Sequence, residues 1–425
     1  MKVLTEPRRV YNFLRRQLKA PWARFATLPD PRDRRGQRWG VVPIVRTVFA
    51  AILAGFKTLR DVEKQSRTLA LPGFAPLRRR LPDTTVYDLL PRLDPSALLQ
   101  TLRAQVRTLW RSKLLFPVGL PCGVVAIDGK SLGALDHDAA GWGQRQTRDH
   151  DGSPYWLVRV LRAVLTSSVG KTALWQMPIP PQTNEMGCFV AMFDALRAQY
   201  DVLFDIVTVD AGMTSKAHAA YVHAAGKGYV MAVKEGQPEL LRELRRVLLP
   251  QTDCAPLAHS EWERQKGHSV QRRLYRSLDV AGLPEWESLR QAWLVRTVHR
   301  TDDGRETHED RFFITNVHIG RLAPSQSLRV VREHWSIEND CNWTQDLMLS
   351  EDDTPMCTAG TATQSLGLLR LLTYNLHQLA RRKHLRPPSK TPKDDDDGPQ
   401  LPWRDVLRAF DHALTQKDAR PAPVT

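Results

Sequence analysis

The sequence GVVAIDGK, at residues 123–130, decides the fold class of this chain of 425 residues. Its apolar and β-branched run is typical of a strand buried in a sheet, and the run ends at Asp128. FDIVTVDAG, at 204–212, has the same pattern and ends its apolar run at Asp210. An Asp that directly follows a buried strand is held at the sheet edge, where its carboxylate can face a cleft. Either Asp could equally be an ordinary turn residue.

The segments around these two runs predict an α/β fold with a mixed sheet, because strand-like and helical patterns alternate. Strand-like runs recur at 157–166, 174–179 and 229–233, and helical spacing occurs at 185–200 and 216–225. We therefore expect a sheet that is flanked by helices.

Turn-separated β-rich runs follow, and they predict an insertion of antiparallel strands at 256–322. A long helix is expected at 325–347 and another at 365–383. The segment 387–399, which contains four consecutive aspartates, is expected to be a flexible linker before a short helix near 403–414. These aspartates favour a solvated loop over a ligand site.

The first 120 residues predict an all-helical unit that carries the whole excess of positive charge. They hold 24 Lys and Arg against 8 Asp and Glu, whereas the remaining residues hold 37 against 38. Arginine forks match phosphate oxygens, so we favour a module that faces nucleic acid over a solvated basic surface without a partner. An anionic membrane surface is less favoured, because the basic residues do not share one long amphipathic helix.

Several other classes of protein find no support in the sequence. No window of 18 apolar residues and no signal peptide is present, so we expect a cytoplasmic protein that associates with the nucleoid when bound to DNA. The five cysteines lack a C-x-x-C pair and are expected to be reduced thiols. The glycine spacing around residues 123–131 does not fit a Walker-type ATP site.

A third carboxylate lies in a segment of helical character, VVREHWSIENDCNW at 330–343. Glu338 lies one turn after His334 and Trp335 and one turn before Asn342, so polar and aromatic groups share a face that a core helix would keep aliphatic. An exposed glutamate in an amphipathic helix is the plainer alternative. Three carboxylates that met at one sheet edge could hold two Mg²⁺ or Mn²⁺ ions, about 3.5–4 Å apart, for phosphoryl displacement.

These segments together resemble a DDE transposase of the insertion-sequence type, in particular the H-repeat-associated group. The resemblance covers residues from about 25 to 383 and rests on segments from the N-terminal part and from the part with the carboxylates. These segments are LPDPRDRRGQRW (28–39), FKTLRDVEKQS (56–66), LPDTTVYDLLPRLDP (81–95), AIDGKSL (126–132), QTNEM (182–186), VDAGMTSKAHAAYVHAAGKGYVMAVKEGQ (209–237), REHWSIENDCNW (332–343) and SEDD (350–353).

The resemblance implies a ribonuclease H-like catalytic core and a metal site. By the match of motifs, Asp128 and Asp210 correspond to the two metal-binding aspartates, and Glu338 corresponds to the helical glutamate. It implies two Mg²⁺ or Mn²⁺ ions, double-stranded DNA as partner, and a homodimer or higher oligomer on paired DNA ends.

The implied organisation has five parts: a helical, basic DNA-binding domain (1–120), the first part of the core (121–255), the β-rich insertion (256–322), the second part of the core (323–385), and a linker and tail (386–425).

Several residues near these motifs are candidates for DNA contact. They are Lys130, Lys234, Arg332, His334, Trp335, Arg34, Arg35 and Arg38. Surface lysines are common, and Trp335 could equally belong to the core. Asn184 and Glu185 open the helix before the second Asp strand, either as a helix cap or in support of the site.

The predicted activity is the cutting of element ends and the joining of the freed 3′ hydroxyl to target DNA. Two alternatives stay open: a catalytically inactive DNA-binding protein, and a metal-dependent nuclease that cuts without joining strands.

Overall fold

The computed structural model describes residues 7–136, 141–265, 267–280, 283, 285–352, 356–357, 361–385 and 400–415. The predicted linker at 387–399 lies outside these residues. No helix within the described ranges is long and apolar enough to cross a membrane.

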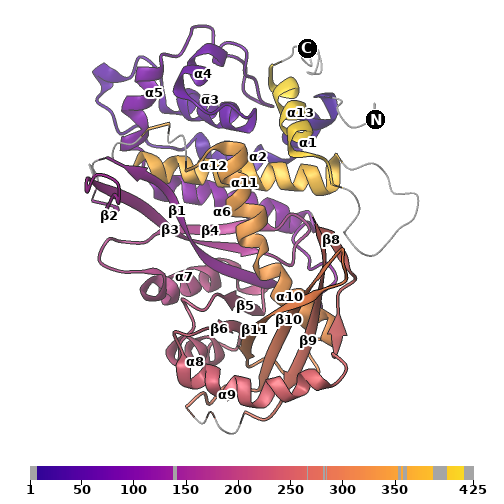
Figure 1. The fold of residues 1–425 in the computed structure, drawn as a ribbon. Helices are drawn as coiled ribbons and strands as arrows, with labels where there is room; N and C mark the ends of the chain where they lie inside the picture. Colours follow the sequence, from indigo (N-terminus) through magenta and orange to yellow (C-terminus); the bar gives the residue numbers. More distant parts are fainter. Residues whose placement is uncertain are drawn as a thin grey trace.

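One mixed sheet forms the centre of the described structure (Figure 1). Its strand order is β2-β3-β1-β5-β6-β11-β10-β9-β7, with β4 paired to β3 and β8 paired to β9. The strands are β1 (Val124–Leu135), β2 (Gly143–Thr147), β3 (Pro154–Leu165), β4 (Thr172–Pro178), β5 (Ile206–Val209), β6 (Gly228–Val233), β7 (Ala258–His259), β8 (Glu263–Gln265), β9 (His268–Ser277), β10 (Gln291–Thr301) and β11 (Glu306–Thr315).

The strand directions explain which parts of the sheet are buried. β1 pairs antiparallel with β3 and parallel with β5, and β5 pairs parallel with β6. All four residues of β5 are buried, as expected for the centre of a parallel sheet. β6 then pairs antiparallel with β11, so the strands at 258–315 extend the same sheet. The predicted mixed α/β sheet is therefore confirmed.

Helices cover the sheet and form a separate layer at one end of the molecule (Figure 1). α7 (Glu185–Tyr200), α8 (Lys216–Ala224) and α9 (Pro238–Leu248) connect the strands between β4 and β9. The N-terminal helices are α1 (Pro7–Gln17), α2 (Lys19–Phe25), α3 (Val41–Leu53), α4 (Leu59–Gln65), α5 (Asp83–Leu89) and α6 (Pro95–Arg111), and they gather with α13 (Trp403–Thr415) at the top of the view.

α12 (Ala362–Leu379) joins the N-terminal helices to the sheet, and all 18 of its residues are buried. Asn375 accepts a hydrogen bond from the Ala173 amide of β4 (2.8 Å) and donates to the Ala173 carbonyl (3.0 Å) and to Gln105 of α6 (2.9 Å). His377 Nε2 lies 2.9 Å from the Leu53 carbonyl of α3. Because Asn375 is buried and hydrogen-bonded on both sides of the boundary, helices and sheet pack as one body.

The long helix predicted at 325–347 is wrong in one respect, because the structure interrupts it. α10 (Pro324–His334) is followed by a π-helical segment (Ile337–Asn342) and then by α11 (Trp343–Leu349). The amide of Trp343 donates to the carbonyl of Glu338, five residues back. Such π turns are rare in helices and occur frequently at functional sites.

Replacing Asn375 by Ala removes all three side-chain hydrogen bonds at the boundary. We expect the free energy of unfolding to fall by about 2–4 kcal/mol, because buried polar groups of Ala173 and Gln105 lose their partners. Urea denaturation measures the change. Asn339→Ala, at an exposed position, serves as the control and should cost less than about 1 kcal/mol; equal losses in both variants would contradict this account of the boundary.

Candidate active site

Parallel pairing of β1 with β5 places two carboxylates side by side. Ile127 is in register with Val209, so Asp128 and Asp210 follow at equivalent positions on neighbouring strands. Neighbouring strands lie about 4.8 Å apart. The two aspartates therefore lie next to each other where the parallel pairing of β1 and β5 ends.

The third carboxylate, Glu338, approaches the same place from the π-helical segment. Burial, followed by the negative charges of Glu338, Asp210 and Glu185 in that order, raises the pKa of Asp128 to about 7. The pKa of Glu338 is also raised, first by burial and then by Asp210, while Lys234 and Arg311 act in the opposite direction. The structure thus brings Asp128, Asp210 and Glu338 within electrostatic range of one another.

Glu185 is a fourth carboxylate at this edge, at the first position of α7. Its helix is capped by Asn184, whose side chain accepts a hydrogen bond from the Gly187 amide (3.0 Å). Glu185 forms an ion pair with Arg159 of β3. A Cβ on Gly129 would lie 1.9 Å from Glu185 Oε1, so the glycine that follows Asp128 leaves room for this side chain.

A buried charged network supports Asp128 from behind. Arg162 of β3 is the register partner of Asp128, and its side chain has no solvent exposure. It donates to both carboxylate oxygens of Glu351 (2.8 and 2.9 Å) and to Asn342 Oδ1 (3.1 Å). Asn342 Nδ2 in turn donates to Asp128 Oδ2 (3.4 Å). The network therefore fixes the end of the π-helical segment against the first carboxylate.

The sequence did not single out Arg162 or Glu351 as site residues. Arg162 interrupts the apolar run LVRVLRAVL of β3, and Glu351 lies in the SEDD segment. An Arg inside an otherwise apolar strand is a signal for a buried ion pair, because a lone buried charge is too costly to retain.

The predicted DNA-contacting residues fall into different environments. Lys234 is exposed beside Glu338, and Lys130 forms an ion pair with Asp346 of α11. Arg332 is exposed and forms an ion pair with Glu263. Trp335 is partly buried under the guanidinium of Arg311, which lies 4.6 Å from the ring centroid.

The expected DNA contact of His334 does not fit its position. Its side chain is buried, and its Nδ1 lies 2.9 Å from Thr208 Oγ1 of β5. Burial lowers its pKa to about 4, so the imidazole is neutral. His334 therefore attaches α10 to the sheet.

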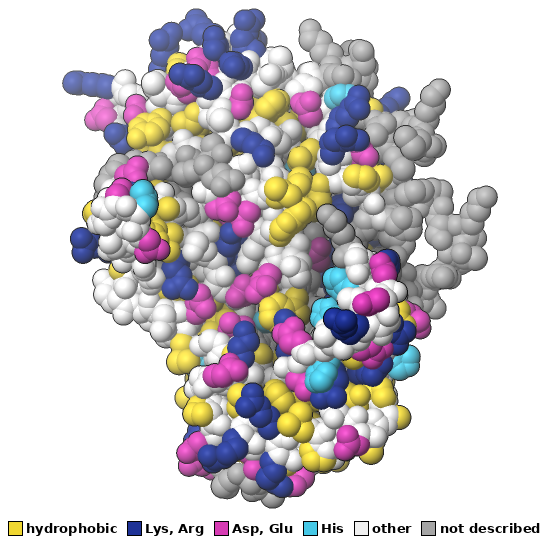
Figure 2. All heavy atoms as spheres, viewed as in Figure 1, with side chains coloured by type: hydrophobic (Ala, Val, Ile, Leu, Met, Phe, Trp, Pro, Cys, Tyr) yellow, Lys and Arg dark blue, Asp and Glu magenta, His cyan; other side chains and the backbone are white. Residues whose placement is uncertain are grey.

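Arg34, Arg35 and Arg38 are exposed in and beside a short 3₁₀ turn (Arg34–Gly36). Figure 2 shows Lys and Arg side chains gathered at the end of the molecule that the N-terminal helices form, and Asp and Glu side chains mixed with Lys and Arg over the rest of this face.

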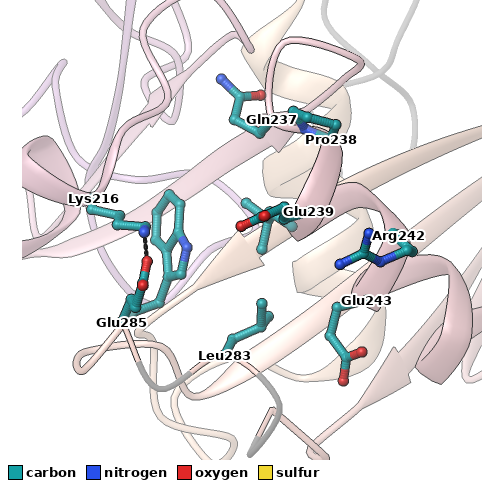
Figure 3. Close-up of a pocket in the computed structure, with 10 residues that line it drawn as sticks. Lys216, Gln237, Pro238, Glu239, Arg242, Glu243, Leu283 and Glu285 are labelled. Carbon is teal, nitrogen blue, oxygen red and sulfur yellow. Dashed lines mark ion pairs between the residues drawn. The ribbon is translucent and has the colours of Figure 1, made fainter.

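Two hollows lie near the sheet edge, and only the smaller one includes a predicted carboxylate. A cavity of about 200 Å³ is lined by Asp210, Lys234, Arg311 and Trp335, among others. A larger one, of about 490 Å³, lies between α8, α9 and the segment at 283–286 (Figure 3). There Lys216 and Glu285 form an ion pair across the opening. None of the three carboxylates lines the larger hollow, so its greater volume does not identify it as the candidate active site.

The carboxylate cluster has the donor chemistry for a hard divalent cation. As placed, no group of three or more His, Cys, Asp or Glu side chains in the described ranges forms a ready ligand set. Burial and then mutual repulsion raise the pKa values of Asp128 and Glu338, and a divalent cation would relieve that repulsion. Asp128, Asp210 and Glu338 therefore fit Mg²⁺ or Mn²⁺ as ligands by charge and by atom type.

Comparisons with known proteins agree with this arrangement. The family model described as "Transposase DDE domain" matches residues 122–376, which confirms the resemblance found in the sequence. An uncharacterized protein of Xanthobacter autotrophicus, from the dhlA 3′ region, is 25% identical over 69% of this chain and 92% of its own length. The putative protein YbfL of Escherichia coli is 22% identical over 85% of this chain and 90% of its own length. The H repeat-associated putative transposase YhhI of the same organism is 22% identical over 60% of this chain and 63% of its own length.

Asp128→Asn should stabilise the metal-free protein. The folded-state pKa of about 7 lies above the ordinary value of 3.8, so the contribution of Asp128 to stability is most favourable at low pH and falls as the pH rises from about 4 to 7. Asn carries no charge, and we expect a gain of about 1–3 kcal/mol at pH 8 that disappears near pH 4. Thermal denaturation in EDTA measures it. In MgCl₂ or MnCl₂ the wild type should gain stability that the variant lacks; no cation effect on either would argue against a metal site here.

Breaking the buried pair should be costly. Arg162→Met leaves Glu351 buried without its partner, and we expect the free energy of unfolding to fall by about 3–5 kcal/mol. The double variant Arg162→Met/Glu351→Leu should recover part of the loss. As a control, Arg264→Met removes an exposed pair with Asp302 and should cost less than about 1 kcal/mol in the same urea titration. Similar losses for both single variants would show that Arg162 is not a structural anchor.

Proposed function

This chain belongs to the family of transposases with a DDE domain, and we propose that it cuts the ends of an insertion sequence and joins the freed 3′ hydroxyl to target DNA. One observation supports this most directly: carboxylates from β1, β5 and the π-helical segment lie within electrostatic range at one sheet edge. Phosphodiester cleavage needs such a set, because its transition state carries negative charge that the protein must offset and position.

We propose that Asp128, Asp210 and Glu338 hold two Mg²⁺ or Mn²⁺ ions. Bound there, the ions would activate the attacking oxygen and stabilise the leaving oxygen of an in-line displacement. The protein supplies position. Asn342 fixes the Asp128 carboxylate, and the strand register fixes Asp210 beside it. Lys234 is exposed next to Glu338 and is placed to bind a phosphate oxygen of the DNA strand.

The order of strands supports a ribonuclease H-like core. In the succession β4-β3-β1-β5-β6, the first two pairings are antiparallel and the last two are parallel. The three carboxylates lie within the central strand β1, directly after its parallel pairing with β5 ends, then just past the end of β5, and on the helical segment that follows the inserted strands. This arrangement fits the core implied by the sequence motifs.

The same proposal includes the organisation of the chain. Residues 1–120 would bind DNA, 121–255 and 323–385 would form the two parts of the core, 256–322 would be an insertion, and 386–425 a linker and tail. The partner would be double-stranded DNA at element ends and target. A homodimer or higher oligomer on paired ends is the expectation from the family.

Neutral replacement of any one carboxylate should abolish cleavage but not DNA binding. We expect Asp128→Asn, Asp210→Asn and Glu338→Gln to lower the rate of Mg²⁺-dependent cleavage by at least about 10²–10³, because each removes charge stabilisation at the reacting phosphate. Gel analysis of a supercoiled plasmid that carries the inverted repeats flanking the gene measures cutting and joining. Glu239→Gln, at an exposed position of α9, is the matched control.

The outcomes separate the proposal from its alternatives. Cleavage with strand joining supports a transposase, and cleavage without joining supports a nuclease. Binding without any Mg²⁺- or Mn²⁺-dependent cleavage supports an inactive DNA-binding protein. Unchanged cleavage in one of the three variants would remove that residue from the site.

A further inference from the structure

A groove between α2 and α6 carries a concentration of arginines outside the carboxylate site. We define the α2–α6 groove by Ala23, Arg24, Arg103, Ala104, Arg107 and Arg111. It encloses about 340 Å³. Arg24, Arg107 and Arg111 are exposed, and Arg103 is partly buried. Ala23 and Ala104 have small side chains and therefore leave room between the arginines for the backbone of a ligand.

The charge in this groove is not balanced by the protein. Arg103, Arg107 and Arg111 are spaced four residues apart on α6, so they lie along one face of the helix in steps of about 6 Å. Like charges at this spacing destabilise a helix. Within the described ranges, none of the groove arginines forms an ion pair with Asp or Glu. The groove therefore holds a row of positive charges that repel one another and that no Asp or Glu of the described residues neutralises.

Two buried donors, one that lines the groove and one within range of its arginines, also lack an acceptor. Arg103 hydrogen-bonds to Gln100 (2.8 Å) and Gln199, but its Nε has no partner among the described residues. Tyr200, at the end of α7, is only 3% exposed, and its hydroxyl likewise has no partner there. The positive charges of Arg103 and Arg107 act on this hydroxyl. Buried donors without acceptors are rare, and an anionic oxygen from outside would satisfy them.

We infer that the α2–α6 groove binds the phosphodiester backbone of double-stranded DNA. The inference rests on the proposed function for the identity of the polyanion. A single anion would need one pocket, whereas evenly spaced arginines along a helix match a chain of phosphates. Arg103 Nε, with the Tyr200 hydroxyl on which its charge acts, would donate to one phosphate oxygen, and Arg107 and Arg111 would contact the neighbouring phosphates.

The test compares two double variants with the same change in net charge. Arg107→Gln/Arg111→Gln removes two exposed groove arginines, and Arg404→Gln/Arg408→Gln removes two exposed arginines with the same spacing on α13. Fluorescence anisotropy with a labelled duplex that contains an element end gives Kd as a function of salt. Loss of two phosphate contacts should lower the slope of log Kd against log salt by about 2 and weaken binding about 10–30-fold at 150 mM salt.

The control variant should stay within about 2-fold of the wild type. Tyr200→Phe, which removes only the buried hydroxyl, should weaken binding about 3-fold. Inorganic phosphate at millimolar concentration should compete poorly with DNA; full competition would show a site for single phosphate ions and overturn the inference. Equal effects of the two double variants, or no effect of the groove variant, would also overturn it.

Failure of this inference is distinguishable from failure of the proposed function. If the wild type binds and cuts DNA but the groove variant binds like the control, only the groove assignment falls. If the wild type binds no DNA, both fall. If Asp128→Asn binds DNA with the wild-type salt slope while the groove variant does not, the groove inference is supported independently of the chemistry.

Discussion

The parallel register of β1 and β5 forces two carboxylates into adjacent positions, and much of the surrounding structure serves to keep them there. The register leaves Asp128 and Asp210 no freedom to separate, because each directly follows the last residue pair of the β1–β5 ladder, Ile127 and Val209. Burial, the charge of Glu338 and then that of Asp210 raise the pKa of Asp128. Arg162 does not offset the repulsion between the carboxylates, because its positive charge is paired with the carboxylate of Glu351. The network therefore holds the geometry without neutralising the site.

The π-helical segment sets the direction in which Glu338 faces. α10 is attached to β5 through His334 and Thr208, while Asn342 at the end of the segment contacts Asp128. The wider π turn lies between these two attachments and carries Glu338. A regular helix would place the residues after His334 at different angles around the axis. The irregular turn thus reconciles the two attachments with a carboxylate that faces the sheet edge.

The sequence was informative where a residue type contradicts its surroundings, and uninformative where contacts join distant segments. Asp128 and Asp210 were found because each ends an apolar run. The π turn was not predicted, because it depends on the contacts at its two ends, His334 with Thr208 and Asn342 with Asp128, and not on a local pattern. The burial of His334 was not predicted, because it depends on Thr208, 126 residues away. A contact between residues so far apart leaves no local sequence pattern. The local pattern did predict the strands that bring such residues together.

Charge separation along the chain follows from the same constraint. A cluster of carboxylates repels the DNA backbone that it is proposed to cut, so affinity must come from elsewhere on the protein. The first 120 residues, which we propose to supply it, hold 24 Lys and Arg against 8 Asp and Glu. α12 then fixes the distance between the basic N-terminal helices and the carboxylates at the sheet edge, because its buried Asn375 and His377 connect α6 and α3 to the sheet. A flexible joint would let the arginines fold back and neutralise the carboxylates. A buried helix prevents this, and so leaves the acidic edge free for cations.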